Sequence, residues 1–465
     1  MTLSAVDAAR EAPDRVALVL GGVPVTFAEL AARVAPLSVA SAGPPTPFVG
    51  RSDRATLERV YAHVTAAAPM LLLHPRLTES ERRAVLAMLE PELAAWPATG
   101  AYAATSAHAA TGAEAEPAHD AARCLAVLMT SGTTGRPKGV VLSRRAFLAS
   151  ARASEGNIGL RDGDRWLLGL PIAHVGGLSI LTRSLIARTA VVVPQEVADG
   201  KRLDAHALVR TIEEDRVTLV SLVPTQLEWL LSGAVEWRPP AHLRAILLGG
   251  AAARPSLLER AAEHGLPVLT TYGLTEACSQ VTTQRVGTVN RGELGSGPSI
   301  DGAEVRIRDG VIEVRGPMLF DGYLPAPGAP PFTPDGWFPT NDLGRLDDHG
   351  NLHVVGRRSE LVITGGENVH PAEVEAVVDR CPGVAACCAF GVPDETWGEL
   401  LAVAIVPAAG GAPDDASLAE FCRERLSSHR RPRLVVHVGE LATNAAGKLD
   451  RAATRTRALP TLRRL

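Results

Sequence analysis

The sequence predicts a multidomain α/β protein: a large N-terminal part of doubly wound α/β layers with a small β-barrel-like subdomain, then a small α+β C-terminal domain. Three observations support this prediction. The chain of 465 residues is too long for one ordinary hydrophobic core. From residue 121 to about 290, short apolar runs alternate with turns and helical segments, as in α/β layers. The character of the sequence then changes near residue 295 and again near residue 359.

The composition is that of a globular protein and excludes several other classes. Hydrophobic residues make up 46% and charged residues 21% of the chain, so it is not disordered. A net charge of −4 offers no general field for nucleic acid or a membrane surface. The first residues lack the order of a signal peptide, and no apolar run is long enough to span a bilayer. Six cysteines without paired metal spacing indicate reduced thiols in a cytoplasmic protein.

The first 290 residues contain the elements expected of the α/β layers. Residues 1–120 alternate alanine-rich helical stretches with short apolar runs, and residues 97–120 are expected to form a surface linker. A helix is expected at 224–231. Short buried strands are expected at 124–129, 218–223, 245–248 and 267–270.

The rest of the chain follows two other patterns. Polar and apolar residues alternate at 304–308 and 311–315, which are separated by an Asp-Gly turn and predict antiparallel β structure. From Ser359, mixed strand and helix patterns continue to the end of the chain. Pro371 is expected in the first turn of a helix, where its missing N–H costs nothing.

The most informative segment is the loop from Thr130 to Gly139, which follows the apolar run 124–129. Glycines let backbone N–H groups approach phosphate oxygens, hydroxyls donate hydrogen bonds, and a lysine offsets negative charge. A Walker loop is excluded because Pro137 and Gly139 flank the lysine in place of Gly and Ser/Thr. The loop therefore predicts a polyphosphate site rather than an ordinary Gly/Thr turn. Its candidate contact residues are Thr130, Ser131, Gly132, Thr133, Thr134 and Lys138.

Two further turns follow predicted strands, at the strand ends where open α/β sheets bind ligands. The first is Gly249-Gly250-Ala251, and the second runs from Thr270 to Glu276. Tyr272 offers a flat face for a purine, and Glu276 offers an oxygen ligand for Mg²⁺ beside phosphates. The alternative is a tyrosine packed at a helix start and a solvated glutamate, which the phosphate loop disfavours.

Three polar segments of the second half complete the set of candidates. Asp342 lies in the predicted β region, where a carboxylate at the end of a short loop can accept hydrogen bonds from both ribose hydroxyls; the alternative is an Asx turn. The segment 356–360 coincides with a change of sequence character and is a plausible hinge; the alternative is a rigid surface loop. Lys448 follows glycine on a loop and can carry a charge to an anionic reaction centre, although a lone lysine is usually solvated.

Together these motifs resemble the adenylate-forming superfamily of acyl-CoA synthetases, peptide-synthetase adenylation domains and luciferases. The resemblance covers nearly the whole chain. The phosphate loop, Tyr-Gly-Leu-Thr-Glu, Trp-Phe-x-Thr-x-Asp, Gly-Arg, Gly-Gly-Glu-Asn and the final Gly-Lys occur in the family order. The resemblance implies two half-reactions with ATP, Mg²⁺ and coenzyme A. A carboxylate attacks the α-phosphorus of ATP to give an acyl-adenylate and pyrophosphate, and a thiol then displaces AMP.

The resemblance also implies a role for each candidate residue. The residues of the phosphate loop would hold the β- and γ-phosphates, with Thr134 and Glu276 at the metal. Lys448 would bridge the attacking carboxylate and the α-phosphate, so the residues act by positioning and electrostatic stabilisation. The remaining implied contacts are Gly249, Gly250, Ala251 and Tyr272 at the adenine, Thr275 at the α-phosphate, and Asp342 with Arg357 at the ribose.

The resemblance further divides the chain into an N-terminal domain, 1–357, with its β-rich subdomain at about 295–357, and a mobile C-terminal domain, 358–465. In the family this domain rotates between the half-reactions, which moves Lys448 out and the Gly365-Gly366 segment in to build the thioester site. Ser359 occupies the pivot position, which is often Asp or Lys. Asn341 replaces the usual glycine before the ribose-binding aspartate.

Several strings resemble the o-succinylbenzoate–CoA ligases of menaquinone biosynthesis, namely 170–184, 246–250, 271–280 and 357–368. o-Succinylbenzoate has two carboxylates, so the one that is not activated needs a permanent countercharge. Arg183, in an apolar segment nine residues after His174, offers a bidentate fork for it. The alternative is a helix arginine that faces solvent or a nearby acid.

The acyl pocket would be lined by His174, Gly249 and Gly273; the alternative for His174 is a histidine at a helix start that is satisfied by the backbone. The pair Ile172-Ala173 departs from the Leu-aromatic pair usual in that group, which would widen the pocket wall. Three functions stay open: a ligase for o-succinylbenzoate, a ligase for another aryl or short acyl acid, and a non-catalytic nucleotide-binding protein or acyl-adenylate donor to a carrier protein. The expected partners are the acid, ATP and CoA, with no nucleic acid and no membrane insertion. The sequence does not determine the oligomeric state, and a homodimer is one of the options.

Overall fold

The computed structural model describes residues 2–97, 123–131, 137–231, 237–326, 331–444 and 448–465. The predicted surface linker at 97–120 lies outside these ranges except for its first residue. None of the helices in the described ranges is long and apolar enough to cross a membrane.

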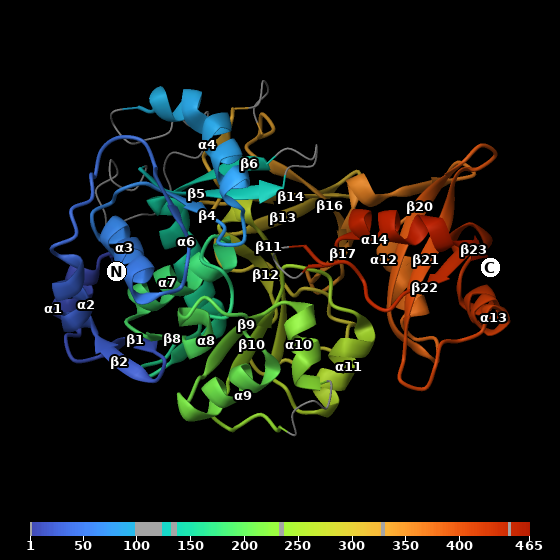
Figure 1. Ribbon diagram of the computed structural model, residues 1–465, viewed down its shortest axis with the longest axis horizontal. Helices are drawn as coiled ribbons and strands as arrows, with labels where there is room; N and C mark the ends of the chain where they lie inside the picture. The colour runs from blue at the N-terminus through green and yellow to red at the C-terminus, as the bar shows by residue number, and fades with distance from the viewer. Residues whose placement is uncertain (1, 98–122, 132–136, 232–236, 327–330, 445–447) are drawn as a thin grey trace.

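Two sheets form the N-terminal layers (Figure 1). The interior strands of the larger sheet pair in parallel, and its two edge strands pair antiparallel. In spatial order, this eight-stranded sheet contains β12 (Ser279–Thr283), β11 (Val268–Leu274), β10 (Ala245–Leu248), β9 (Leu219–Leu222), β7 (Arg165–Leu167), β8 (Ala190–Val193), β1 (Val16–Leu20) and β2 (Val23–Thr26). The five-stranded sheet contains β15 (Gly322–Leu324), β6 (Pro137–Ser143), β5 (Cys124–Ser131), β4 (Met70–Leu73) and β3 (Thr46–Val49).

Helices cover both faces of these sheets, because successive side chains of a strand point to opposite faces. Leu72 and Val191 pack in the largest core cluster, which includes α6 and α7 and lies between the sheets. Leu71 packs with α4 on the outer face of the five-stranded sheet. Val192 packs with α9, α10 and α11 on the outer face of the eight-stranded sheet. The helices of this part are α1 (Ala5–Glu11), α2 (Phe27–Val34), α3 (Arg54–Thr65), α4 (Glu79–Ala94), α6 (Arg144–Ile158), α7 (Val175–Ala187), α8 (Gln195–Ala198), α9 (Ala205–Glu214), α10 (Pro224–Leu231), α11 (Pro255–Glu263) and the 3₁₀ turn η1 (Thr275–Ala277).

Local sequence signals explain where several helices begin and end. Helix α2 begins with a capping box, in which Thr26 and Glu29 exchange side-chain to backbone hydrogen bonds. Helix α4 begins with the same arrangement at Thr78 and Glu81. Helix α6 ends at Gly159, whose left-handed conformation (φ 63°) favours glycine.

A four-stranded antiparallel sheet follows, as the alternating pattern predicted, and it projects from the layers toward the C-terminal domain (Figure 1). Its strands are β13 (Glu304–Arg308), β14 (Val311–Arg315), β16 (Phe338–Leu346) and β17 (Leu352–Arg357). Phe320, Phe332 and Phe338 pack together at ring-centroid distances of 5.1 to 6.0 Å beside this sheet. The predicted α/β architecture with an added β-rich part is therefore confirmed.

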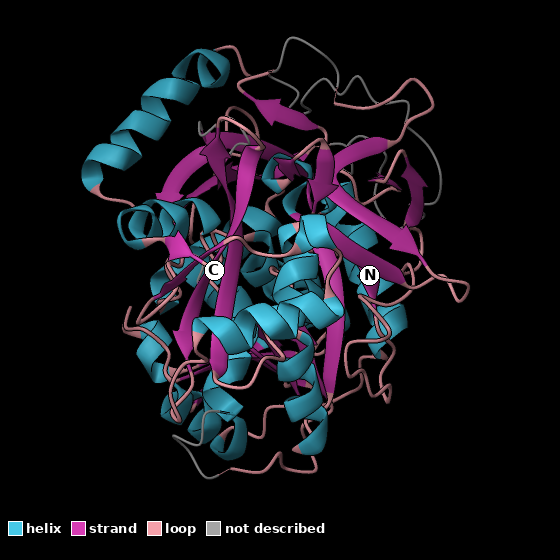
Figure 2. Cartoon of the chain, turned by 90° about the vertical axis from the view of Figure 1, so that its right-hand side faces the viewer, coloured by secondary structure: helices cyan, strands magenta, loops and turns pink. Residues whose placement is uncertain are grey.

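The C-terminal domain has hydrophobic clusters of its own, which run from Val362 to Leu465 and share no residue with the N-terminal clusters. It lies at one end of the molecule in Figure 1 and faces the viewer in Figure 2. Its helical elements are η2 (Arg358–Glu360), α12 (Pro371–Val378), α13 (Asp415–Arg425), η3 (Ser428–Arg430), α14 (Arg451–Ala458) and η4 (Leu459–Thr461). Its six strands are β18 (Val362–Thr364), β19 (Glu367–Val369), β20 (Val384–Asp394), β21 (Gly398–Pro407), β22 (Leu434–His437) and β23 (Arg463–Arg464).

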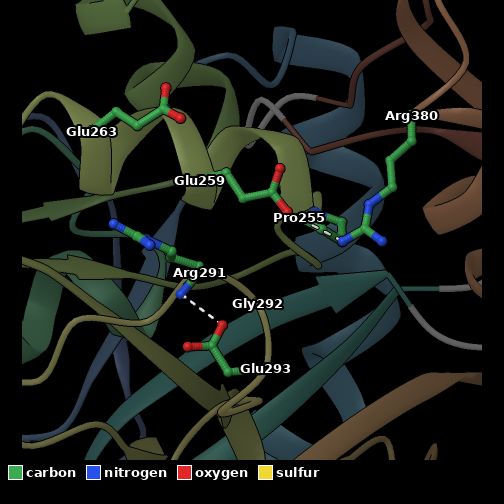
Figure 3. Close-up of a pocket in the computed structure, with 7 residues that line it drawn as sticks. All are labelled: Pro255, Glu259, Glu263, Arg291, Gly292, Glu293 and Arg380. Atoms are coloured by element: carbon green, nitrogen blue, oxygen red, sulfur yellow. Dashed lines mark hydrogen bonds and ion pairs between the residues drawn. The ribbon is translucent and has the colours of Figure 1, made fainter.

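Ion pairs join the C-terminal domain to α11 and to Arg254, the residue that directly precedes this helix. Arg254 contacts the buried carboxylate of Asp379 at 2.8 Å, and Arg380 contacts Glu259 at 3.1 Å. A cavity of about 540 Å³ lies beside this second pair (Figure 3). It is lined by Pro255, Glu259, Glu263, Arg291, Gly292, Glu293 and Arg380, and none of these is a predicted site residue. We therefore assign the cavity to the domain interface.

Candidate active site

The phosphate-loop residues are carried by the hairpin of β5 and β6. Thr130 lies opposite Lys138 in this antiparallel pair, and the Thr130 hydroxyl contacts the Lys138 carbonyl at 3.4 Å. Ser131 is the last residue of β5. The loop between the strands contains Gly132, Thr133 and Thr134, which lie outside the described residues, so their phosphate contacts stay a prediction.

Lys138 and Glu276 are brought together although they are distant in the sequence. Lys138 Nζ lies 3.3 Å from Glu276 Oε1, and both side chains are at least two-thirds buried. The hydroxyl of Tyr323 donates to the same Oε1 at 2.9 Å, and Lys138 Nζ lies 3.8 Å from the centre of the Tyr323 ring. Glu276 Oε2 takes no part in these contacts. An ammonium and a carboxylate therefore stand together beside the predicted phosphate loop.

Tyr272, Asp342 and Arg357 form a second cluster. The Tyr272 hydroxyl donates to Asp342 Oδ2 at 2.8 Å, and Arg357 Nε lies 3.5 Å from Oδ1. Asp342 and Arg357 are direct partners across β16 and β17. Burial raises the pKa of Tyr272 and of Asp342. The structure thus brings the predicted adenine and ribose residues into contact with one another.

Glycines in the two predicted turns permit close backbone packing. A Cβ atom on Gly249 would lie 2.7 Å from the Thr271 side chain, and one on Gly273 would lie 1.9 Å from the Ser279 carbonyl oxygen. Gly250 has φ +80°, a region that favours glycine. Ala251 and Thr275, the latter at the start of η1, are half-buried.

Lys448 extends from the C-terminal domain to these N-terminal turns. A Cβ atom on Gly250 would lie 3.1 Å from Lys448 Cε and 3.5 Å from Nζ. The backbone of Lys448 is held by Asn444, whose N–H donates to its carbonyl at 2.8 Å and whose side-chain oxygen accepts from its N–H at 3.1 Å. Burial and the charge of Arg357 lower the pKa of Lys448, and Asp342 raises it. The predicted catalytic lysine therefore stands among the predicted nucleotide residues.

Helix α7 and its N-cap carry two of the four predicted substrate-binding residues. His174 is its N-cap, and its ring centroid lies 4.9 Å from that of His74. Burial, with smaller contributions from His74 and Lys448, lowers the pKa of His174 to about 4. Arg183 is 4% exposed, and its Nη2 donates to the Ser150 hydroxyl at 3.2 Å.

The environment of Arg183 excludes the alternative of a solvent-facing helix arginine. Its Nε is buried and has no hydrogen-bond partner, and no ion pair to a carboxylate is found for it among the described residues. Burial lowers its pKa to about 10. Arg183 is thus a desolvated cation without a countercharge in the described part of the chain.

Gly365 and Gly366 form the turn between β18 and β19, with φ of +59° and +82°. Both are exposed, and a Cβ on Gly365 would lie 2.9 Å from the Trp397 ring of the same domain. The structure therefore places this turn on the surface of the C-terminal domain rather than among the nucleotide residues.

The segment between the two domains makes contacts that were not predicted from the sequence. The two departures from the family pattern meet: Asn341 Nδ2 donates to the Ser359 hydroxyl at 3.0 Å. Arg451, three residues after Lys448, contacts Glu360 of η2 at 3.1 Å and Glu375 of α12. Tyr323 and His74 were not predicted from the sequence, because neither lies in a motif. Each was singled out only by its contact with a residue far along the chain, Glu276 for Tyr323 and His174 for His74.

Two family models match the chain. The AMP-binding enzyme model matches residues 47–324, and the model of the AMP-binding enzyme C-terminal domain matches residues 373–448. The first match covers more than half of the chain, and it includes the hairpin of β5 and β6 and both predicted ligand-binding turns. The chain belongs to the AMP-binding enzyme family.

Within this family, the chain is similar to 2-succinylbenzoate–CoA ligases. It is 42% identical to the ligase of Bacillus licheniformis over 337 residues, which are 70% of this chain and 68% of that protein. It is 34% identical to the ligase of Bacillus pumilus over 473 residues, which cover 94% of each.

Solved structures of a related synthetase give the same result. The o-succinylbenzoate CoA synthetase from Bacillus subtilis, in complex with the acyl-adenylate intermediate, is 31% identical with a TM-score of 0.80, covering 100% of this chain and 99% of that one. A double mutant of that synthetase, bound with its product analogue, is 30% identical with the same coverage but a TM-score of 0.65.

Proposed function

We propose that the protein is an ATP-dependent acid–CoA ligase that activates o-succinylbenzoate as its acyl-adenylate and then forms the CoA thioester, in menaquinone biosynthesis. One observation carries the acid-activating part: Lys448 of the C-terminal domain faces Gly250, and Asp342 and Arg357 are close enough to shift its pKa. The choice of acid is supported by the relatives at 34–42% identity. A cytoplasmic location accords with this function.

The first half-reaction requires two anions, the carboxylate and the α-phosphate, to approach each other. A desolvated ammonium placed between them offsets their repulsion, and its effect grows where water is excluded. Lys448 fits this role because it is largely buried and its loop is held by Asn444. Lys138 would hold the β- and γ-phosphates, while Tyr272 and Asp342 would bind adenosine at the other end of the site.

Mg²⁺ fits the residues around Glu276. In proteins this ion is usually held by one or two carboxylates together with substrate phosphates. No group of three or more His, Cys, Asp or Glu side chains suited to a metal occurs in the described ranges, which agrees with a shared site rather than a protein cage. Glu276, with Thr134 as the predicted second ligand, would hold the ion, which neutralises phosphate charge during transfer. Tyr323 keeps the carboxylate of Glu276 in place.

We infer that the described orientation of the C-terminal domain is the adenylate-forming one. The TM-score is higher to the synthetase with the acyl-adenylate than to the mutant with the product analogue, at equal coverage. Lys448 lies at the nucleotide turns, whereas Gly365 and Gly366 are exposed. Thioester formation with CoA would therefore need a rotation of this domain about Ser359, with a boundary near residues 357 and 358.

Arg183 would bind the second carboxylate of o-succinylbenzoate. It is a buried cation without a carboxylate partner among the described residues. An anionic ligand would therefore offset the free-energy cost of burying its charge. Arg183→Met should raise the KM for o-succinylbenzoate by about tenfold to a hundredfold, the range for one lost charged hydrogen bond, and leave the KM for ATP unchanged. An unchanged KM for o-succinylbenzoate in a folded variant would remove Arg183 from the acyl pocket.

The deciding experiment measures CoA-dependent AMP release over a panel of acids. We expect o-succinylbenzoate to have the highest kcat/KM, above benzoate, other aryl acids and fatty acids. A higher kcat/KM for another acid would leave the ligase activity and replace the substrate. Adenylate formation without CoA-dependent turnover would favour an acyl-adenylate donor to a carrier protein. Failure of every acid to support pyrophosphate exchange into ATP would refute the acid-activating function.

A further inference from the structure

His74 and His174 meet at the junction of the two N-terminal sheets. His74 directly follows β4, and His174 precedes α7. Their ring centroids are 4.9 Å apart, with the planes at 45°. Gly50 follows the parallel strand β3, and a Cβ there would lie 3.2 Å from Ala173, so the start of α7 is packed against the ends of β3 and β4. Two imidazoles thus stand at strand ends, where α/β proteins bind ligands.

The hydrogen bonding of His74 determines where its proton lies. Its Nδ1 accepts the Arg76 backbone N–H at 3.2 Å, so a neutral His74 carries its proton on Nε2. That Nε2 is buried and has no hydrogen-bond partner among the residues described, and the same is true of His174 Nε2. A buried donor without a partner is costly, which suggests that its partner is a bound ligand.

Burial is the main cause that lowers the pKa of both imidazoles, and the surrounding charges add to it, so the pair is neutral. Arg76 and Lys448 both disfavour a proton on His174, and Arg76 does the same for His74. The pair therefore offers neutral hydrogen-bonding groups, and the Nε2–H of His74 needs an oxygen acceptor. Lys448, which would neutralise the reacting carboxylate, is close enough to His174 to contribute to its lowered pKa, so the acceptor lies at the acyl end of the site.

We propose that His74 is a further substrate-binding residue, whose Nε2–H donates a hydrogen bond to an oxygen of the bound acid beside His174. This proposal rests on the acid-activating function proposed above. It adds the residue that directly follows β4 of the five-stranded sheet to an acyl pocket otherwise assigned to α7 and the nucleotide turns. The bound acid would then be contacted by residues that lie at the ends of strands from both N-terminal sheets.

The test compares three substitutions at this position in the full-length protein. His74→Phe keeps a flat ring against His174 but removes the donor. His74→Asn keeps an acceptor for the Arg76 N–H but is too short to replace the Nε2 donor. His74→Gln places an amide N–H near the position of the lost one. KM values for the acid and for ATP are measured by pyrophosphate release, with whichever acid the wild type activates best.

We expect His74→Phe and His74→Asn to raise the KM for the acid by about tenfold or more, the effect of one lost hydrogen bond to a charged acceptor, with the KM for ATP unchanged. His74→Gln should restore most of the affinity for the acid. His63→Asn is the matched control, because His63 is also buried, bonds the Ala68 carbonyl through Nδ1 and has a buried Nε2 without a partner in the described ranges. The control should leave the KM for the acid unchanged.

An acid KM within twofold of wild type in a folded His74→Asn protein would overturn the proposal. A parallel rise of both KM values, or an equal rise in the His63 control, would also overturn it, because either result indicates general loss of structure. A wild-type protein that activates no acid would instead refute the proposed function.

Discussion

Replacement of Arg451 by methionine should weaken the C-terminal domain and the support of Lys448. Arg451 is 16% exposed and pairs with Glu375, which is 14% exposed, and with Glu360, which is 32% exposed. Removing one partner of a buried pair costs about 3–5 kcal/mol, because the other charge stays buried and unpaired. The more exposed Glu360 contact should contribute at most about 1 kcal/mol. We therefore expect Arg451→Met to cost about 3–5 kcal/mol and Glu360→Gln about 1 kcal/mol or less.

The same contact network links stability to chemistry. Arg451 is the first residue of α14, and it joins that helix to the interdomain turn η2 through Glu360 and to α12 through Glu375. Lys448 lies three residues earlier, so a loosened α14 should displace its ammonium from the nucleotide turns. Adenylate formation should fall several-fold more than thioester formation from preformed acyl-adenylate.

Urea unfolding and amide hydrogen exchange of peptides from the C-terminal domain measure the loss of stability, and pyrophosphate exchange measures the first half-reaction. Arg463→Met is the control, because it removes a pair with Asp415 in which both side chains are well exposed. A double-mutant cycle with Glu360→Gln isolates the contact to η2. A loss of stability in Arg451→Met no greater than in the control, or equal losses in the two half-reactions, would refute the reasoning.

Three further predictions concern the site and the hinge. Lys448→Ala should slow adenylate formation by about two to four orders of magnitude while thioester formation from preformed acyl-adenylate survives; equal losses in rapid-quench assays would contradict the two-orientation account. Asn341→Gly removes the hydrogen bond to Ser359 and should raise thioester formation relative to adenylate formation by about two- to fivefold, the value of one exposed hydrogen bond; an unchanged ratio of single-turnover rates would count against this. Burial lowers the pKa of His174 to about 4, so the unfolded chain binds this proton more tightly. The stability that this group contributes is complete above about pH 6.5 and is lost as the pH falls through 4, a change of about 1–3 kcal/mol that urea unfolding should show to be smaller in His174→Gln.

Local elements were predictable because their signals lie within a few residues. The apolar run 245–248 is β10, and the helix expected at 224–231 is α10. The antiparallel pair at 304–308 and 311–315 is also found with these bounds. In each segment, the structure predicted by the apolar pattern and the flanking turn residues is the same as the one that the packing of the fold requires.

The site was only partly predictable. The motifs identified Lys138, Glu276, Asp342 and Lys448, and the fold brings them to two adjoining clusters. The partners of these residues were not predictable, because a residue such as Tyr323 has no local pattern that marks it. Its hydroxyl reaches Glu276 only because β15 pairs with β6.

The sequence alone determined the family, the order of the motifs and several strands and helices, since these depend on residue type and spacing along the chain. Only the tertiary structure decided that Arg183 is buried without a carboxylate among the described residues, that the ring of His74 contacts that of His174, and that Lys448 faces Gly250. These contacts depend on which distant segments pack together. The packing of distant segments is determined by the burial of apolar surface over the whole chain, so it cannot be predicted from any short segment.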